Sequence, residues 1–300
     1  IFSKTKKYIR SFYNEYMKKK YSLIEIHNRP EYLNFLIKKK IESKLIFIFH
    51  NNPLTMRGSR SVKERLNILE NTNTIIFISK WIKKKFFEDL SIKDSSNCEI
   101  LYHGIKKPNK LKKKNKIIVF TGKLNKSKGF DIFCEATKKI LDEFNDWKVI
   151  AAGNEQREKI NLNHPNATIK NWLPHEKVLE LYSKSSISVV PSRWQEPFGR
   201  TAMESAAYGC ATIISNKGGL PETFNSDLIL KKINSNSLYL LLKKLIRNKN
   251  FIEKIQKKNF NNFLHELQIT INYLDDIKFN LLDKKINVIK NLGPKILHIG

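Results

Sequence analysis

A strand–loop–helix unit at residues 187–208 constrains the fold of this chain more than any other segment. Its first residues, ISVVP, predict a buried strand, and residues 200–208 predict a helix that follows a short turn. Two carboxylates stand eight positions apart, Glu196 in the turn and Glu204 in the second helical turn. Loops of this kind line the ligand-binding edge of an open parallel sheet. The unit therefore predicts an α/β domain with a site at the carboxyl ends of its strands.

The groups expected at this edge favour two different parts of a ligand, a phosphate and hydroxyl groups. The N–H groups at the start of the helix suit a phosphate group. The carboxylates of Glu196 and Glu204 repel a phosphate but bind hydroxyl groups. A nucleotide sugar satisfies both, because it carries a diphosphate together with ribose and sugar diols. We therefore expect a nucleotide-sugar site, whereas an ordinary βαβ unit with chance carboxylates is the alternative.

Glycine is scarce in this chain and is concentrated at the ends of predicted strands. Of the 11 glycines, seven lie between residues 122 and 219. These are Gly122, Gly129, Gly153, Gly199, Gly209, Gly218 and Gly219. Glycine allows a backbone to approach a ligand closely. The clustering predicts one continuous ligand cleft, although turn chemistry explains any single glycine.

Residues 191–222 resemble the E-x7-E signature of retaining GT-B glycosyltransferases, in particular those of family 4 (group 1). The family pattern runs PS-x-x-E-x-F-G, then E-A-x-A-x-G-x-P-V, then G-G-x-x-E. The matching residues are Pro191-Ser192, Glu196 to Gly199, Glu204 to Gly209, and Gly218 to Glu222. Ser205 replaces the usual alanine, and Cys210-Ala211 stand where Xaa-Pro is common. The resemblance implies an α/β fold, with two Rossmann-like domains facing a cleft.

A second part of the resemblance lies in residues 117–133, where a predicted strand leads into a lysine-containing loop. The family pattern G-R-L-x-x-x-K-G corresponds here to GKLNKSKG, with Gly122, Lys123 and Lys128 at the matching positions. In relatives the two cations hold the donor diphosphate. Lys123 and Lys128 are therefore expected to stabilise the leaving group, by on the order of 3 kcal/mol each. Lysine at 123 keeps the charge of the usual arginine but loses its bidentate geometry.

Two further strand–loop segments resemble the nucleotide-contacting parts of the family. The run VIAAGNE ends at Gly153, where relatives pass the backbone close to the nucleotide. Residues 171–173 correspond to a loop that lines the nucleobase pocket, mainly through backbone groups. Backbone contacts of this kind do not identify the base. The donor is expected to be a nucleotide-diphosphate sugar of UDP or GDP type. His175 is expected to be a loop or helix-cap residue rather than a catalyst.

The N-terminal third contains two predicted strands, 22–30 and 44–53, with a His-Asn pair near the end of each. In the resemblance, His50 corresponds to a histidine that faces the sugar and diphosphate across the cleft. We expect His50 to contact and polarise the donor, and His27 is a candidate for the acceptor side. A purely structural role is the alternative for both. Three arginines follow, any of which could reach an anionic acceptor or a phosphate: Arg57, Arg60 and Arg65.

The 300 residues are enough for two α/β domains. We expect a partial acceptor-side domain at 1–108, a nucleotide-sugar-binding domain at 109–265, and a helix or tail at 266–300. Family members begin with a strand and a glycine-rich loop, which this sequence lacks before its first predicted strand. The resemblance therefore predicts an N-terminally truncated fragment. The run PKILHIG (294–300) is typical of another strand–glycine beginning, which suggests the start of a further module.

The net charge of +28 is unevenly distributed. Residues 1–120 hold 28 Lys and Arg against 10 Asp and Glu, a net of +18, and the remainder carries +10. An anionic membrane attracts such a surface by about 1 kcal/mol per nearby basic residue. A soluble surface with biased composition is the alternative. No apolar run approaches the roughly 20 residues that span a bilayer, so we expect a cytoplasmic protein, peripheral on the inner face of the membrane.

Cysteine and aspartate usage bears on redox and metal chemistry. The three cysteines are Cys98, Cys134 and Cys210, and their wide spacing and odd number argue for a reducing compartment without disulfides. No Asp-x-Asp pair occurs in the chain. The other large glycosyltransferase architecture uses that pair to hold a divalent metal. The resemblance therefore implies no cofactor and no metal, with lysines and helix dipoles taking the metal's place.

Together these inferences predict a retaining hexosyltransferase that uses a glycan or lipid-linked acceptor, in cell-surface polysaccharide or lipopolysaccharide synthesis. By resemblance, Glu196 holds the donor sugar, aided by the N–H groups of Phe198 and Gly199, and Glu204 binds the ribose. An epimerase of the same architecture and a non-catalytic GT-B scaffold are alternatives. A nucleic-acid-binding protein would need basic residues interleaved with aromatic ones on one face, whereas the lysine runs are scattered.

Overall fold

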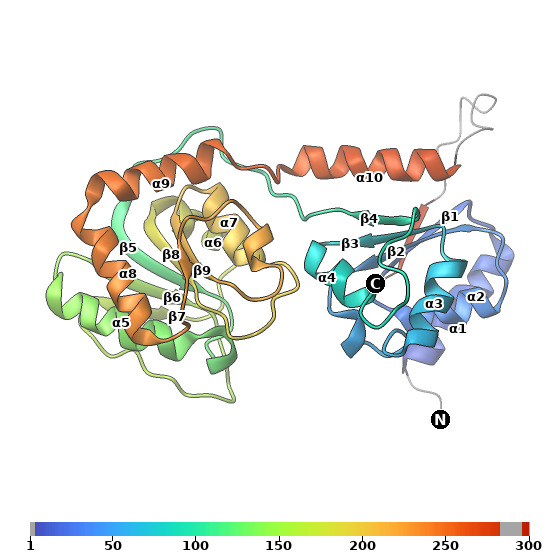
Figure 1. Cartoon of the computed structure of the whole chain (residues 1–300), viewed down its shortest axis with the longest axis horizontal. Coiled ribbons are helices and arrows are strands. Elements are labelled where there is room, and N and C mark those ends of the chain that lie inside the picture. Colours follow the sequence, from blue (N-terminus) through green and yellow to red (C-terminus); the bar gives the residue numbers. More distant parts are fainter. Residues whose placement is uncertain (1–3, 283–295, 300) are drawn as a thin grey trace. The chain divides into compact units, whose positions relative to one another are not determined.

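The computed structural model describes residues 4–282 and 296–299, which form two compact α/β units (Figure 1). The first unit takes the described residues up to Tyr102 and from Ile269 onward, and the second takes residues 103–268. Residues 266–300 were expected to form a separate helix or tail. In the structure, the described residues from 269 onward belong with the first unit, because α10 (Leu267–Leu282) bonds to it through side chains. One such bond joins the Tyr273 hydroxyl to the Glu99 carboxylate at 2.8 Å.

The first unit is built on a parallel sheet with the strand order β11-β1-β2-β3-β4. Its strands are β1 (Leu23–His27), β2 (Lys44–Phe49), β3 (Thr74–Phe77), β4 (Cys98–Ile100) and β11 (Ile296–Ile299). Its helices are α1 (Lys4–Lys18), α2 (Pro30–Lys38), α3 (Val62–Asn71), α4 (Lys80–Phe86) and α10, with a 3₁₀ turn η1 (Pro53–Thr55). The strand expected within 294–300 as the start of a further module corresponds to β11, which lies parallel to β1 with Leu23 opposite Ile296 and so belongs to the sheet of the first unit.

The second unit contains a parallel sheet of order β10-β9-β8-β5-β6-β7. Its strands are β5 (Asn115–Thr121), β6 (Lys148–Ala152), β7 (Ala167–Lys170), β8 (Ser185–Val190), β9 (Ala211–Ser215) and β10 (Ile229–Leu230). Its helices are α5 (Phe130–Glu143), α6 (His175–Lys184), α7 (Arg200–Ala207), α8 (Ser235–Arg247) and α9 (Lys249–Asn261), with 3₁₀ turns η2 (Lys126–Lys128) and η3 (Leu220–Glu222). The chain runs outward from β5 through β6 to β7, then returns to place β8 on the other side of β5. This reversal makes the loops after β5 and β8 neighbours, which is where open sheets bind ligands.

Side-chain alternation along β5 distributes the core of the second unit between the two faces of its sheet. Ile118 and Phe120 join the large cluster that α5, α8 and α9 cover. Val119, between them, packs with Tyr182 of α6 on the opposite face. Strands covered on both faces read as nearly continuous apolar runs. This explains why β5 and β8 are readily predicted from the sequence.

Lys114 ties together the C-terminal ends of the two helices that carry site residues. Its ammonium donates to the carbonyl oxygens of Tyr182 (2.9 Å) and Ser183 (3.1 Å) in α6, and of Tyr208 (2.6 Å) after α7. The last carbonyls of a helix have no partner within the helix, and a cation there also complements the helix dipole. Burial lowers the pKa of Lys114.

We expect Lys114→Met to destabilise the second unit by about 3 kcal/mol, because three partly buried carbonyls lose a charged donor. Urea unfolding followed by tryptophan fluorescence measures this change. The exposed neighbour Lys113 provides a matched control, and Lys113→Met is expected to leave the midpoint within experimental error. Equal midpoints for the two variants would contradict this capping role of Lys114.

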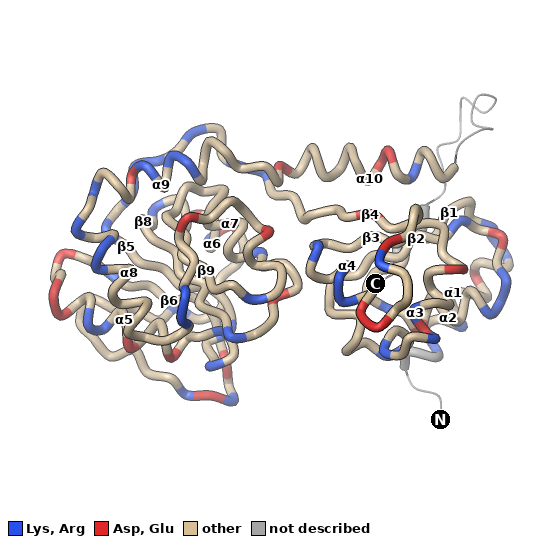
Figure 2. The backbone as a smooth tube through the Cα atoms, in the orientation of Figure 1, with Lys and Arg blue, Asp and Glu red and all other residues tan. Residues whose placement is uncertain are grey.

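Three further properties of the two units are their basic residues, the apolarity of their helices and the state of their cysteines. Figure 2 shows basic residues on each unit, in agreement with the excess of lysine in the sequence. Among the described helices, none combines the length and apolarity required to cross a bilayer. The three cysteines are free and buried, and burial raises the pKa of Cys98 to about 12.

Candidate functional site

The loop between β8 and α7 is held in place by its own backbone and by the segment that follows β9. The N–H of Gly219 donates to the carbonyl oxygen of Glu196 at 2.7 Å, and Glu196 forms a parallel bridge with Gly218. Gly218 has φ +62°, and a Cβ there would lie 2.1 Å from the Glu196 carbonyl oxygen. The glycine pair is therefore a backbone support for Glu196.

Glu196 and Lys128, predicted separately from two motifs, meet in the structure. Lys128 Nζ lies 2.6 Å from Glu196 Oε1, and the side chains are 31% and 10% exposed. Lys128 ends η2, whose first turn is capped by Asn125, which accepts from the Lys128 N–H at 3.0 Å. The loops after β5 and β8 thus place a cation and a carboxylate in contact at the carboxyl edge of the sheet.

The loop after β5 is also held by residues of the loop after β6. The Asn125 amide donates to Glu155 at 3.0 Å, and Arg157 donates to the same carboxylate at 2.9 and 3.0 Å. The hydrogen bonds from Arg157, followed by that from Asn125, lower the pKa of Glu155 to about 2. The loop that carries Lys128 is therefore tied to the loop that follows Gly153.

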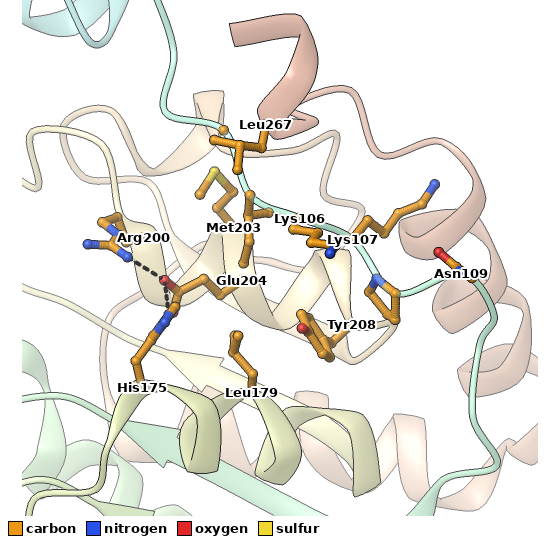
Figure 3. Close-up of a pocket in the computed structure, with 13 residues that line it drawn as sticks. Lys106, Lys107, Asn109, His175, Leu179, Arg200, Met203, Glu204, Tyr208 and Leu267 are labelled. Atoms are coloured by element: carbon orange, nitrogen blue, oxygen red, sulfur yellow. Dashed lines mark hydrogen bonds and ion pairs between the residues drawn. The ribbon is translucent and has the colours of Figure 1, made fainter. Parts of the chain in front are cut away.

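Glu204 lies in the second turn of α7, with its side chain almost wholly buried. His175 Nε2 lies 3.0 Å from Glu204 Oε1, and Arg200 Nη2 lies 3.1 Å from the same oxygen. Figure 3 shows both contacts converging on this carboxylate. Arg200 stands one helical turn before Glu204, a spacing that brings side chains together on a helix. The two partners orient Glu204 at the wall of a cavity.

Two cavities meet at Glu204, and His175 and Arg200 line both of them. The first, about 520 Å³, lies at the ends of β5, β6 and β7 and is lined further by Thr121, Gly122, Ala152, Gly153, Trp172, Leu173, Val178 and Thr201. The second, about 540 Å³, lies beside residues 104–109 and is lined by Leu179, Met203, Tyr208 and Leu267 (Figure 3). Both are large enough for part of a drug-sized ligand.

The structure brings together most of the predicted residues of the second unit. Gly122, Gly153 and Glu204 line the first cavity, and Phe198 and Gly199 form the turn before α7. Phe198 is buried, with its ring against His103 and His265 at centroid distances of 5.8 and 5.7 Å. Lys123 is exposed on the loop after β5.

Two contacts of this site, those of His175 and Arg200 with Glu204, were not predicted from the sequence. His175 does begin α6, as expected for a helix-start residue, but its side chain also contacts Glu204. Arg200 was not singled out, although its spacing from Glu204 could have indicated the contact. Trp172 belongs to the loop 171–173 that was expected to line a nucleobase pocket; it lines the first cavity and is 71% exposed. An exposed tryptophan beside a cavity offers a flat surface for stacking a ring.

The predicted histidines of the N-terminal third lie in the first unit. His27 ends β1 and His50 follows β2, and His27 Nδ1 lies 2.9 Å from His50 Nε2. Their rings stack with centroids 5.2 Å apart. Of the three arginines considered earlier, Arg65 is buried and donates to backbone carbonyls, including that of Arg60 at 2.7 Å. This contact gives Arg65 a structural role.

The comparison with protein families gives a match over half of the chain. Residues 104–262 match the model described as "Glycosyl transferases group 1". These residues contain every element of the second unit from β5 to α9. They also contain the Lys128–Glu196 pair and Glu204.

Curated relatives and a solved structure agree with the family match. The chain is 23% identical over 249 residues to spore coat protein SA of Bacillus subtilis, covering 69% of this chain and 63% of that protein. It is 29% identical over 160 residues to an uncharacterized 42.6 kDa protein in the cps region of Klebsiella pneumoniae, covering 51% and 41%. The structure of HepE from Anabaena in complex with UDP and glucose superposes with a TM-score of 0.70 at 14% identity, covering 91% of this chain and 80% of that one.

These comparisons establish the fold of the chain. The two parallel-sheet units are those of the GT-B glycosyltransferase fold, as the sequence analysis expected. The chain spans about 63% of the length of spore coat protein SA.

Proposed function

The chain belongs to the glycosyl transferases of group 1, and from this premise we propose that it moves a hexosyl group from a nucleotide-diphosphate sugar to an acceptor hydroxyl. The anomeric configuration is retained, as in family 4, and no metal ion takes part. The observation that carries the proposal is the contact between Lys128 and Glu196, on loops at the carboxyl edge of the same sheet from which the helix of Glu204 begins. This edge supplies a cation for a diphosphate and two acids for hydroxyl groups.

The nucleoside is proposed to occupy the first cavity. Glu204 binds the ribose diol with a carboxylate that His175 and Arg200 hold in place. Gly122 and Gly153 pass the backbone close to the nucleotide, and Trp172 stacks on the base. A UDP-type donor is favoured over a GDP-type donor, because the similar HepE structure contains UDP.

Sugar transfer requires stabilisation of the departing diphosphate. Charge develops on the phosphate oxygen as the glycosidic bond breaks, and Lys128 and Lys123 neutralise it. Glu196 holds hydroxyls of the donor sugar, aided by the N–H groups of Phe198 and Gly199. The acceptor attacks from the same face that the diphosphate leaves, and the departing phosphate takes the acceptor proton. His50 is proposed as a polarising residue for the donor.

The acceptor is proposed to be a glycan or a lipid-linked sugar in cell-surface polysaccharide synthesis. The names of two relatives, a spore coat protein and a protein of a cps region, support this setting. The excess of basic residues supports an attachment of the protein to the anionic inner face of the membrane. The proposed location is therefore the cytoplasm, peripheral to that face.

Donor affinity tests the proposal directly. We expect Glu204→Ala to weaken binding of the preferred donor by 10- to 100-fold, because hydrogen bonds from ribose hydroxyls to a charged acceptor contribute about 1.5–3 kcal/mol. Isothermal titration with UDP-, GDP- and ADP-sugars measures this change. Glu180→Ala, on the exposed side of α6, is the matched control and is expected to bind as the parent does.

Two results would count against the proposed function. Unchanged donor affinity in Glu204→Ala would remove the ribose assignment. Conversion of the nucleotide sugar to its epimer, with no glycoside formed when acceptors are supplied, would replace transfer by epimerisation. Product analysis with and without acceptor separates these two reactions.

A further inference from the structure

A lysine-rich segment of the second unit borders a cavity that the proposed function does not use. Seven of the eleven residues at 106–116 are lysines, and no acidic residue lies among them. The segment leads into β5 beside a cavity of about 650 Å³, at the amino ends of β5, β6 and β8. The proposed donor site lies at the carboxyl ends of the same sheet, and this cavity shares no lining residue with the two that meet at Glu204. It is therefore a separate site.

Five apolar side chains form part of the lining of this cavity. Trp147 and Ile252 are 5% and 6% exposed and belong to the large core cluster of the second unit. Phe144 and Ile246 are half-buried and pack against that cluster, and Leu111 is half-buried as well. Because most of these side chains are anchored in the core, the cavity is formed before any ligand arrives. It offers a fixed apolar surface.

The charged side chains around the same cavity are mostly basic. Six lysines line it, against two acidic residues. Both acids are already paired, Asp146 with Lys116 and Glu253 with Lys249 at 3.9 Å. Lys114 is the cap of α6 and α7 described above. The other three are exposed and make no ion pair with the described residues: Lys112, Lys113 and Lys257. A hollow lined by unpaired charges of one sign attracts ligands of the opposite sign.

The combination of apolar lining and unpaired ammonium groups restricts the kind of ligand. A free phosphate group would use the lysines but not the apolar surface. A nucleic acid needs an exposed ring on which bases stack, and Trp147 is buried. An anionic phospholipid carries both a charged phosphate and apolar acyl chains. Basic clusters and pockets of this kind bind the head groups of anionic lipids.

We propose that this cavity is a binding site for an anionic phospholipid of a membrane surface. The lipid phosphate lies against Lys112, Lys113 and Lys257, and an acyl chain enters the cavity beside Trp147. The second unit then meets the membrane with the edge of its sheet opposite the proposed donor site, which leaves the carboxyl edge open to a nucleotide sugar. The site gives the membrane attachment proposed above a place in the fold, and it does not depend on sugar transfer.

Flotation of the full chain with vesicles tests the role of the lysines. We expect binding to vesicles of phosphatidylglycerol and phosphatidylcholine in equal parts, and none to phosphatidylcholine alone. Replacing Lys112, Lys113 and Lys257 together by glutamine is expected to weaken binding roughly 100-fold, since each basic residue near an anionic membrane contributes about fivefold. The matched control removes the same charge from exposed lysines after β6 and β10: Lys159, Lys231 and Lys232. It is expected to change binding less than about threefold, because charges beyond a Debye length are screened.

Quenching of tryptophan fluorescence tests whether an acyl chain enters the cavity. Phosphatidylglycerol with brominated acyl chains is expected to quench the parent protein more strongly than Trp147→Phe, because bromine quenches a ring only at close range. Trp147→Phe is expected to float with vesicles as the parent does. Equal quenching of the two proteins places the lipid outside the cavity and overturns the proposal. Equal flotation of the triple glutamine variant and its control overturns it as well.

Two further results separate this proposal from its neighbours. If the triple glutamine variant keeps its vesicle binding but loses binding to single-stranded RNA, the lysines serve a nucleic acid and the lipid site is rejected. Donor titration is expected to give the parent affinity for the triple variant, because none of the three lysines lines the first cavity. A chain that binds vesicles through this cavity but transfers no sugar would reject only the proposed function.

Discussion

Replacing Lys128 by methionine is expected to lower kcat for sugar transfer by about 10²- to 10³-fold, the loss typical of removing one preorganised group from a developing oxyanion. Lys128 is held 2.6 Å from Glu196, within reach of the diphosphate that the carboxyl edge of the sheet is proposed to bind. Steady-state transfer from the preferred donor measures the effect. Lys128→Arg keeps the charge and is expected to retain part of the rate.

The experiment must distinguish the loss of the Lys128 charge from damage to the fold. Lys126 stands two positions away on the same 3₁₀ turn and is exposed, so Lys126→Met is the matched control with an expected change below about twofold. Lys128→Met leaves the buried Glu196 carboxylate without its cation. The double variant Lys128→Met with Glu196→Gln removes that charge, and we expect it to recover stability but not rate. Full turnover by Lys128→Met would contradict the leaving-group role.

The second large effect concerns the backbone under the first cavity. We expect Gly153→Ala to destabilise the second unit by about 4 kcal/mol, since it combines strain with overpacking. Gly153 has φ +152°, and a Cβ there would lie 1.7 Å from the carbonyl oxygen of Gly122. The clash is relieved only if the ends of β5 and β6 separate. Their separation also widens the first cavity, where the donor is proposed to bind. Thermal unfolding is expected to show a midpoint about 10 °C lower, together with weaker donor binding.

Gly122 provides the comparison that isolates the clash. It has φ +130°, but nothing lies within 4 Å of the position that its Cβ would occupy. Gly122→Ala therefore adds backbone strain alone, at a cost of about 1–2 kcal/mol. Comparable melting temperatures for the two alanine variants would show that the close approach of the two loops does not matter.

The parts of the fold that the sequence predicts are those governed by local pattern. The apolar runs that become β5 and β8 are covered on both faces, and the helix after each begins where glycine ends the loop. The GT-B fold expected from these patterns is confirmed by the solved structures. The motif residues Glu196, Glu204 and Lys128 reach one edge of the sheet because every strand there is parallel.

Contacts between distant residues could not be predicted in the same way. Periodicity indicates which face of a helix is buried but does not name its partner, so the contact between His175 and Glu204 was missed. The return of α10 to the first unit was missed for the same reason, and with it the Lys278–Glu25 pair. A boundary expected at residue 266 lies instead within the beginning of that helix, where α10 passes from one unit to the other.

The Lys128–Glu196 ion pair has a consequence for what happens after the reaction. In the proposed function, a bound donor would occupy both residues, the diphosphate taking the ammonium and the sugar taking the carboxylate. Once the sugar had been transferred, Glu196 would have no hydroxyl to hold and would compete with the nucleoside diphosphate for Lys128. The ion pair would thereby favour release of the by-product and limit inhibition by it.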